Sequence, residues 1–122
     1  MNSFTIFLLV KKPKILLAEK YDISNKILKE LTNLESRHIL FATMKQPKSI
    51  QDISREQRIP QSSVYVRIAS LKECSLVHEK VAFSEKGYIT RYYQSKIKDI
   101  EISISKFEPK IRFTKNELVE ND

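Results

Sequence analysis

The sequence predicts an α+β fold in which helices occupy most of the first two thirds of the chain and strands most of the last third. Between residues 49 and 77, two short segments with helical spacing of apolar residues flank a turn. Residues 78–94 contain two β-rich runs around Gly87, and residues 100–105 alternate isoleucine with polar residues, the period of a strand with one buried face. With 122 residues, one glycine and 41% hydrophobic residues, the chain fits one ordered domain with a modest core.

The central segment has the pattern of a helix-turn-helix. In the first helix Ile50 and Ile53 lie three residues apart, and Ser49 is a natural N-cap. Pro60 suits the first position of the second helix, because its missing N–H and fixed φ cost nothing there. The turn is therefore expected at residues 57–59. The buried stripe of the second helix is predicted to be Val64, Ile68 and Leu71.

Three segments precede this motif. Residues 4–10, FTIFLLV, are too short to span a bilayer, and lysines follow rather than precede them, which is the wrong order for a signal peptide. We expect a short strand or a segment covered by a neighbour, and no membrane anchor. Asp22 offers an N-cap to a helix, and Asn33 or Ser36 caps a further helix that runs to Met44. The apolar face of the Asp22 helix is predicted to be Ile23, Ile27, Leu31 and Leu34.

The C-terminal third is predicted to be rich in strands. HEKVAF and YITRYYQ, on either side of residues 84–87, form a hairpin in which some of the tyrosine rings pack on the helices. The alternating isoleucines of residues 100–105 begin a second hairpin, which turns at residues 107–110 and continues through Ile111 and Phe113. Residues 116–122 have no pattern and are expected to fray.

The order of these elements resembles the winged helix-turn-helix of the archaeal and bacterial ArsR/MarR-like transcription regulators. In that family a helix of the form S-x-x-E-I-A-x-E, a turn, and a helix of the form P-x-S-T-V-Y-x-R-I-x-x-L follow one another. The matching residues are Ser49, Asp52, Ile53, Ser54, Glu56, Pro60, Ser62, Ser63, Val64, Tyr65, Arg67, Ile68 and Leu71. The resemblance implies a winged helix-turn-helix over residues 33–95, after an extra N-terminal segment and helix in 1–32. The hairpin and tail in 96–122 are similar to strands that some archaeal members add after the wing.

Three positions depart from that pattern. The family often has glycine in the turn and again after the second helix, where this chain has Arg58 and Ser75. A residue with a side chain is disfavoured at φ > 0, so the turn is either strained or built differently. Many members also have a basic residue where this chain has Val66.

The resemblance implies a sequence-specific DNA-binding transcription regulator. Its recognition helix, about 60–74, would enter the major groove, and its wing, about 78–94, would lie along the backbone. The candidate DNA-binding residues are Ser49, Gln61, Ser62, Ser63, Tyr65, Val66, Arg67, Lys80, Lys86 and Arg91. The alternative is a winged-helix protein–protein interaction module without sequence-specific DNA binding, in which Val66 belongs to an apolar contact patch.

We expect double-stranded DNA and a second copy of the chain as partners. The net charge of +7 favours an anionic partner. Residues 1–48 carry 9 basic against 4 acidic residues and residues 49–77 carry 4 against 3, so elements outside the helix-turn-helix should supply most phosphate contacts. A homodimer is expected because residues 4–10 and the Ile23, Ile27, Leu31 face are apolar elements that the minimal winged fold does not need.

The sequence predicts neither a metal, a cofactor nor an enzyme. Cys74 is the one cysteine, so it cannot form an internal disulfide, which suits a reducing cytoplasm. Cys74, His38 and His78 share no metal-ligand spacing. The chain also has no Gly-rich phosphate loop and no nucleophile with a nearby base.

Overall fold

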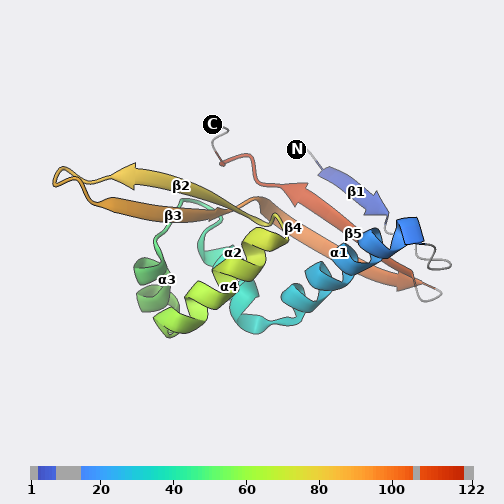
Figure 1. The fold of residues 1–122 in the computed structure, drawn as a ribbon. Helices are drawn as coiled ribbons and strands as arrows, with labels where there is room; N and C mark the ends of the chain where they lie inside the picture. The colour runs from blue at the N-terminus through green and yellow to red at the C-terminus, as the bar shows by residue number, and fades with distance from the viewer. Residues whose placement is uncertain (1–2, 8–14, 106–107, 120–122) are drawn as a thin grey trace.

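The computed structural model describes residues 3–7, 15–105 and 108–119, and in that part of the chain helices precede most of the strands (Figure 1). The elements are β1 Ser3–Phe7, α1 Ile15–Thr32, α2 Leu34–Ala42, α3 Ile50–Gln57, α4 Gln61–Glu73, β2 Val77–Phe83, β3 Ile89–Ser95, β4 Ile97–Ser105 and β5 Glu108–Lys115. Each element expected from the sequence is present, with changed boundaries. Of the apolar run 4–10, residues 4–7 belong to β1 and residues 8–10 lie outside the described residues.

The strands form two separate antiparallel sheets. One has the order β1-β5-β4, and the other is the hairpin of β2 and β3. Figure 1 shows this hairpin extending beyond the helices, with its turn at the far end. Gly87 occupies that turn at φ 83°, a conformation that glycine adopts without steric cost, and its N–H donates to the Ser84 carbonyl at 2.9 Å.

Helix α1 begins at Ile15, so the N-cap expected at Asp22 is wrong. Residues 15–21 contain leucine, alanine, glutamate and lysine, which are strong helix formers, and no residue among them breaks a helix. A cap at Asp22 would have interrupted backbone hydrogen bonds that one continuous helix keeps. Ile27 and Leu31 are buried as predicted, whereas Ile23 is more than half exposed. Leu34 is also exposed, because it is the first residue of α2.

The hydrophobic core joins the helices to both sheets. Its fully buried side chains come from α2, α3, α4 and β5: Ile39, Ile53, Val64, Leu71 and Ile111. Ile27 and Leu31 of α1 belong to the same cluster, which also includes Phe113 of β5. Figure 1 shows α1 running alongside β4 and β5. Part of the α1 face that was expected to serve a partner subunit is therefore used within the chain.

The C-terminal region differs from the prediction in two places. Residues 108–110 belong to β5 rather than to the turn expected at 107–110, and residues 106–107 lie outside the described residues. Asn116 does not fray: its side-chain amide donates to the carbonyls of Met44, at 2.7 Å, and Ser95, at 2.8 Å. These bonds satisfy one buried and one partly buried carbonyl group and connect the end of β5 to the loop after α2. Residues 120–122 of the expected tail lie outside the described part.

The ends of α2 follow local capping rules. The Asn33 side chain accepts a hydrogen bond from the Ser36 N–H at 3.0 Å, so Asn33 is the N-cap and Ser36 is the third residue of the helix. The helix ends at Ala42 rather than at Met44, because the backbone leaves the helical conformation at Thr43. None of the helices within the described ranges combines the length and apolar character needed to cross a bilayer.

Candidate nucleic-acid interface

Helices α3 and α4 form the predicted helix-turn-helix, and the turn between them is strained. Arg58, which ends α3, has φ 55°, in the left-handed region that costs a residue with a side chain about 1 kcal/mol or more. The Ser54 hydroxyl donates to the Ile59 carbonyl at 2.5 Å and holds the turn closed. Pro60 is the N-cap, one position before its expected place, and α4 begins at Gln61.

The end of α4 is built in the same way. Ser75 has φ 58°; its N–H donates to the Lys72 carbonyl and the Leu76 N–H donates to the Leu71 carbonyl, both at 2.9 Å. This pair of bonds is the Schellman motif, in which glycine is the usual left-handed residue. The sequence left open whether the backbone would be strained at these positions or built differently. The structure shows the strained backbone at both Arg58 and Ser75.

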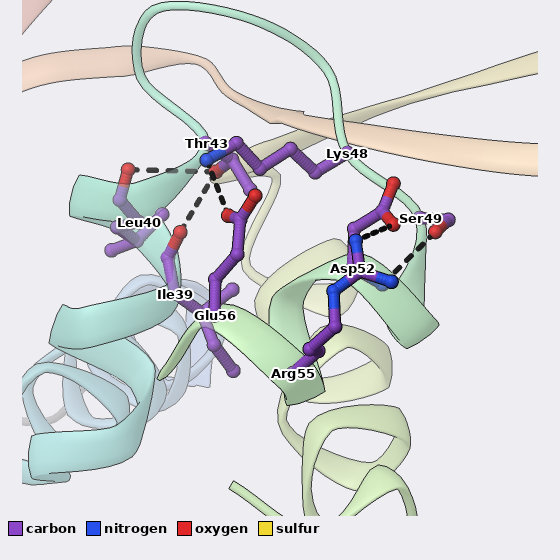
Figure 2. A network of polar contacts seen from close by, with 8 residues as sticks. All are labelled: Ile39, Leu40, Thr43, Lys48, Ser49, Asp52, Arg55 and Glu56. Atoms are coloured by element: carbon purple, nitrogen blue, oxygen red, sulfur yellow. Dashed lines mark hydrogen bonds and ion pairs between the residues drawn. The ribbon is translucent and has the colours of Figure 1, made fainter. Parts of the chain in front are cut away.

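A network of polar contacts fixes the start of α3 (Figure 2). The Ser49 hydroxyl accepts from the Asp52 N–H at 3.1 Å, which makes Ser49 the predicted N-cap. Arg55 pairs with Asp52 at 2.8 Å, and the Lys48 ammonium pairs with Glu56 at 2.6 Å. The contacts of Ser49 and Arg55 stabilise the first turn of α3, and the Lys48–Glu56 pair connects the residue before the N-cap to the last turn of the helix.

The backbone of Lys48 also connects α3 to the β2–β3 hairpin. Lys48 N–H donates to the Tyr93 carbonyl at 2.9 Å, and Tyr93 N–H donates to the Lys48 carbonyl at 2.8 Å. The Tyr93 side chain is buried, and this burial raises the pKa of its phenol. The hairpin is therefore held against the helix-turn-helix by backbone hydrogen bonds and by the ring of Tyr93. Such packing was expected from the sequence for some of the tyrosine rings of the hairpin.

Helix α4 separates a buried face from an exposed face. Val64, Ile68 and Leu71 are buried, as predicted. On the opposite side the side chain of Tyr65 is 66% exposed and that of Val66 is 51% exposed. The candidate residues Gln61 and Ser62 are exposed as well, and Ser63 is half-buried. The structure thus brings most of the candidate residues of α4 to one solvent-facing surface.

Arg67 does not belong to that surface. Its guanidinium pairs with the Glu30 carboxylate of α1 at 3.2 Å, and Glu30 also accepts a hydrogen bond from the Ser36 hydroxyl at 2.5 Å. Glu30 is buried, so Arg67 compensates an interior charge. The sequence contained a signal for this placement of Arg67 next to the core. Arg67 lies three residues after Val64 and four before Leu71, so helical spacing puts it beside the buried stripe of α4.

The basic residues proposed for the hairpin include an arginine that is paired with a glutamate of the same hairpin. Arg91 pairs with Glu79 at 3.2 Å, and Glu79 also binds Lys72 of α4. The hydrogen bond from Lys72, assisted by Arg91, holds the pKa of Glu79 below its ordinary value. Part of the Arg91 charge is therefore neutralised within the chain. Lys80, Lys86 and Arg91 are all exposed to solvent.

The outer half of the hairpin carries exposed apolar residues that the sequence analysis did not single out. Val81 lies opposite Arg91, and Phe83 opposite Ile89. Phe83 is 74% exposed, and the other two apolar side chains are also exposed. Because side chains directly opposite each other project from the same face of a hairpin, these residues continue the face on which Tyr93 lies. Alternation along both strands would have indicated this shared face.

The described residues offer no cluster of three or more His, Cys, Asp or Glu side chains that could hold a metal ion. Cys74, at the C-cap of α4, is half-buried. Burial raises the pKa of its thiol, which keeps the sulfur protonated and weakly nucleophilic at neutral pH.

A helix-turn-helix followed by a two-stranded wing defines a winged-helix protein, here with the additional helix α1 and the C-terminal hairpin β4–β5. The chain is similar to the solved structure of reduced HlyU from Vibrio cholerae N16961, with a TM-score of 0.52 and 18% sequence identity. The match covers 67% of this chain and 81% of HlyU, and at this identity it is a likeness of fold. No protein-family model and no curated protein matches the sequence.

Proposed function

We propose that this chain is a sequence-specific DNA-binding transcription regulator, with α4 in the major groove and the β2–β3 wing against the backbone. The exposed face of α4 is the observation that carries the proposal. Gln61, Ser62, Tyr65 and Val66 face solvent there, while the opposite face is anchored in the core. In a winged-helix fold the second helix of the helix-turn-helix is the element that can enter a major groove, and short polar or apolar side chains can contact base edges.

The proposed contacts divide into two kinds. Ser62, Tyr65 and Val66 would read bases, with the Val66 methyl groups against a thymine methyl. Lys80, Lys86 and Arg91 of the wing would contact phosphates. Ser49 and Ser63 would contact the phosphate backbone of the DNA at the starts of α3 and α4, because helix N-termini favour phosphate. Arg67 is left out, because its guanidinium pairs with Glu30.

DNA binding should be measured by gel shift at two salt concentrations, first on genomic fragments and then on the best sequence. Ser62→Ala and Tyr65→Ala should each cost about 1–3 kcal/mol on that sequence and little on random DNA. Lys86→Ala should weaken binding to all sequences alike and lower the slope of log K against log salt by about one. Arg91→Ala should act in the same direction but by less, because Glu79 neutralises part of the Arg91 charge. Lys110→Ala serves as a matched control, since Lys110 lies on β5, far from the helix-turn-helix in sequence.

The protein-interaction module is the second candidate, supported by the exposed Val66 and by the apolar residues of the outer wing. Val66→Arg separates the two functions. If Val66 contacts thymine, the variant should change the preferred sequence and raise general affinity. If Val66 belongs to a protein contact, the parent should have no preferred sequence to change. The regulator proposal fails if the parent and all five variants bind every DNA equally weakly.

We also propose that the chain acts as a homodimer in a reducing cytoplasm. Much of the dimer surface expected from the sequence is used within the chain, because β1 pairs with β5 and both Ile27 and Leu31 belong to the core. Strand β4 offers another surface: it is an edge strand, and Ile102 and Ile104 are 41% and 71% exposed. Exposed apolar residues along an edge strand favour pairing with a second copy.

A further inference from the structure

A cavity of about 790 Å³ lies between α1, the junction of α4 with β2, and the strands β4 and β5. This volume falls within the range of small-molecule sites in proteins. The DNA-binding surface proposed above does not use the cavity, because none of the proposed DNA contacts on α3, α4 or the wing lines it.

The cavity has apolar walls. Ile23 and Ile27 line it from α1, Ile97 from β4, and Phe113 from β5. Leu76, which follows α4 closely in the sequence, and Val119 add to the apolar lining. A site of this kind takes the hydrocarbon part of a ligand, because burial of apolar surface from both partners is favourable.

Two lysines line the same cavity, and both residues are also exposed to solvent. Lys96 lies between β3 and β4, and Lys115 ends β5. The Asn116 N–H donates to the Lys96 carbonyl at 2.9 Å, and Lys115 is the register partner of Ile97, so the two lysines lie on adjacent backbone segments. The acidic residue in the lining is Glu73, at the end of α4. The local charge therefore favours an anion.

We propose that this cavity binds a small amphipathic organic anion, with its hydrocarbon part between α1 and β5 and its carboxylate on Lys96 and Lys115. Two lysines in the lining of an apolar cavity match a carboxylate joined to an alkyl or aryl body, since charge-assisted hydrogen bonds can fix the head group and burial of apolar surface favours the tail.

The position of the cavity also couples it to the DNA-binding surface, a consequence that rests on the proposed function. Cys74, Ser75 and Leu76 line the cavity and connect α4 directly to β2 of the wing. Ser75 holds the left-handed conformation that sets the angle between the two elements. A ligand that contacts this junction can favour one arrangement of α4 and wing over another, and so change DNA affinity.

Octanoate is a suitable probe, titrated calorimetrically into the full chain without DNA. Octanoate should bind at least about tenfold more tightly than 1-octanol or octylammonium, because the lysine contacts require a negative head group. The double variant Lys96→Ala/Lys115→Ala should weaken octanoate binding about tenfold or more. Lys110→Ala should leave it unchanged, since Lys110 is an exposed lysine of the same strand β5 but does not line the cavity.

The thiol of Cys74 provides a second measurement, because it lines the cavity and is the one cysteine of the chain. Saturating octanoate should slow the alkylation of Cys74 severalfold. The site is overturned if 1-octanol binds as tightly as octanoate, if the double lysine variant keeps full affinity, or if the alkylation rate does not change.

Gel shifts with and without octanoate test the coupling separately. Specific DNA affinity that changes with octanoate in the parent, and not in the double lysine variant, supports the coupling. Unchanged DNA affinity overturns the coupling while the calorimetric result stands. Absence of DNA binding without any octanoate contradicts the proposed function alone, because the cavity is tested in the absence of DNA.

Discussion

Glu30 illustrates how one residue outside the proposed DNA-binding surface can determine the position of that surface. The Glu30 carboxylate is buried in α1 and has two partners, Ser36 of α2 and Arg67 of α4. These contacts link three helices through one charged group. The three side chains stabilise one another, because removing any one of them leaves an uncompensated polar group in the interior.

Glu30→Ala is therefore expected to lower the free energy of unfolding by about 2–3 kcal/mol, as measured by urea denaturation. Arg67→Ala should have a comparable effect, since it leaves the buried carboxylate without its cation. Arg55→Ala is the control: Arg55 pairs with Asp52 at 2.8 Å, but its side chain is exposed, so the loss should stay below about 1 kcal/mol. Equal effects of Arg55→Ala and Arg67→Ala would show that the buried ion pair stabilises the protein no more than the exposed pair does.

Glu79 gives a prediction for the pH dependence of stability. Its pKa lies below the ordinary value of 4.5, chiefly because of the hydrogen bond from Lys72, and the same bond raises the pKa of Lys72 above 10.5. The stabilisation by Glu79 is complete above pH 4.5 and is lost as the pH falls through its lower folded-state pKa. The stabilisation by Lys72 is complete below pH 10.5 and is lost as the pH rises through its higher folded-state pKa.

Glu79→Gln should consequently reduce stability at pH 7, by less than about 1 kcal/mol because the pair is partly exposed, and the difference from the parent should shrink as the pH falls below 4.5. Urea midpoints at several pH values measure this difference. Glu101→Gln is a suitable comparison, because Glu101 lies 3.8 Å from Arg112 and both side chains are well exposed. A Glu79→Gln effect that is constant with pH would mean that the carboxylate charge is irrelevant.

At the scale of elements, the two left-handed helix ends set the geometry of the helix-turn-helix. Arg58 ends α3 and Ser75 follows α4, and both have φ near 55–58°. Glycine would relieve the steric cost at each position and offset this gain in part through its greater freedom in the unfolded chain. We expect Arg58→Gly and Ser75→Gly each to stabilise the protein by about 0.5 kcal/mol.

Thermal denaturation should show a small rise in Tm for each of these glycine variants. Ala69→Gly is the control, because residue 69 is exposed and lies inside α4, where glycine should cost about 1 kcal/mol. A loss of stability in Ser75→Gly would show that the serine side chain contributes more than its backbone strain costs.

The order of elements could be predicted from the sequence because local patterns determine it. The spacing of Val64, Ile68 and Leu71 gave the buried face of α4, and glycine with flanking β-rich runs gave the wing. The start of α1 could not be found in this way. Asp22 is a good N-cap by residue type, but the residues before it form a helix equally well, and capping preference alone does not choose between the two.

Sequence patterns could not predict the contacts between elements that lie far apart in the sequence. The partner of Arg67 lies 37 residues away in α1, and Asn116 binds a carbonyl 72 residues away. No local period specifies either pairing. The exposed isoleucines of β4 show the same limit, because alternation predicts that one face of a strand is apolar without saying whether the same chain covers it.

At the scale of the whole molecule, the two sheets have different surroundings. The wing is held to the helices at its base by Lys48 and Tyr93, and its outer half extends into solvent (Figure 1). The sheet of β1, β5 and β4 packs on α1 through Ile111 and Phe113, but its edge strand β4 leaves Ile102 and Ile104 exposed. A second copy that covers β4 would bury this apolar surface and would leave both wings free for their proposed contact with DNA.

Light scattering at micromolar concentration should therefore give the mass of a dimer. Ile102→Glu/Ile104→Glu should convert the dimer to a monomer, because two carboxylates in a closely packed interface are costly to desolvate. Val81→Glu/Phe83→Glu is the matched control on the wing and should leave the mass unchanged, since both positions are exposed residues of β2, in the other sheet. A monomeric parent would rule out the dimer. Dissociation caused by the wing variant, with a dimer retained in the β4 variant, would place the interface on the wing and contradict its proposed contact with DNA.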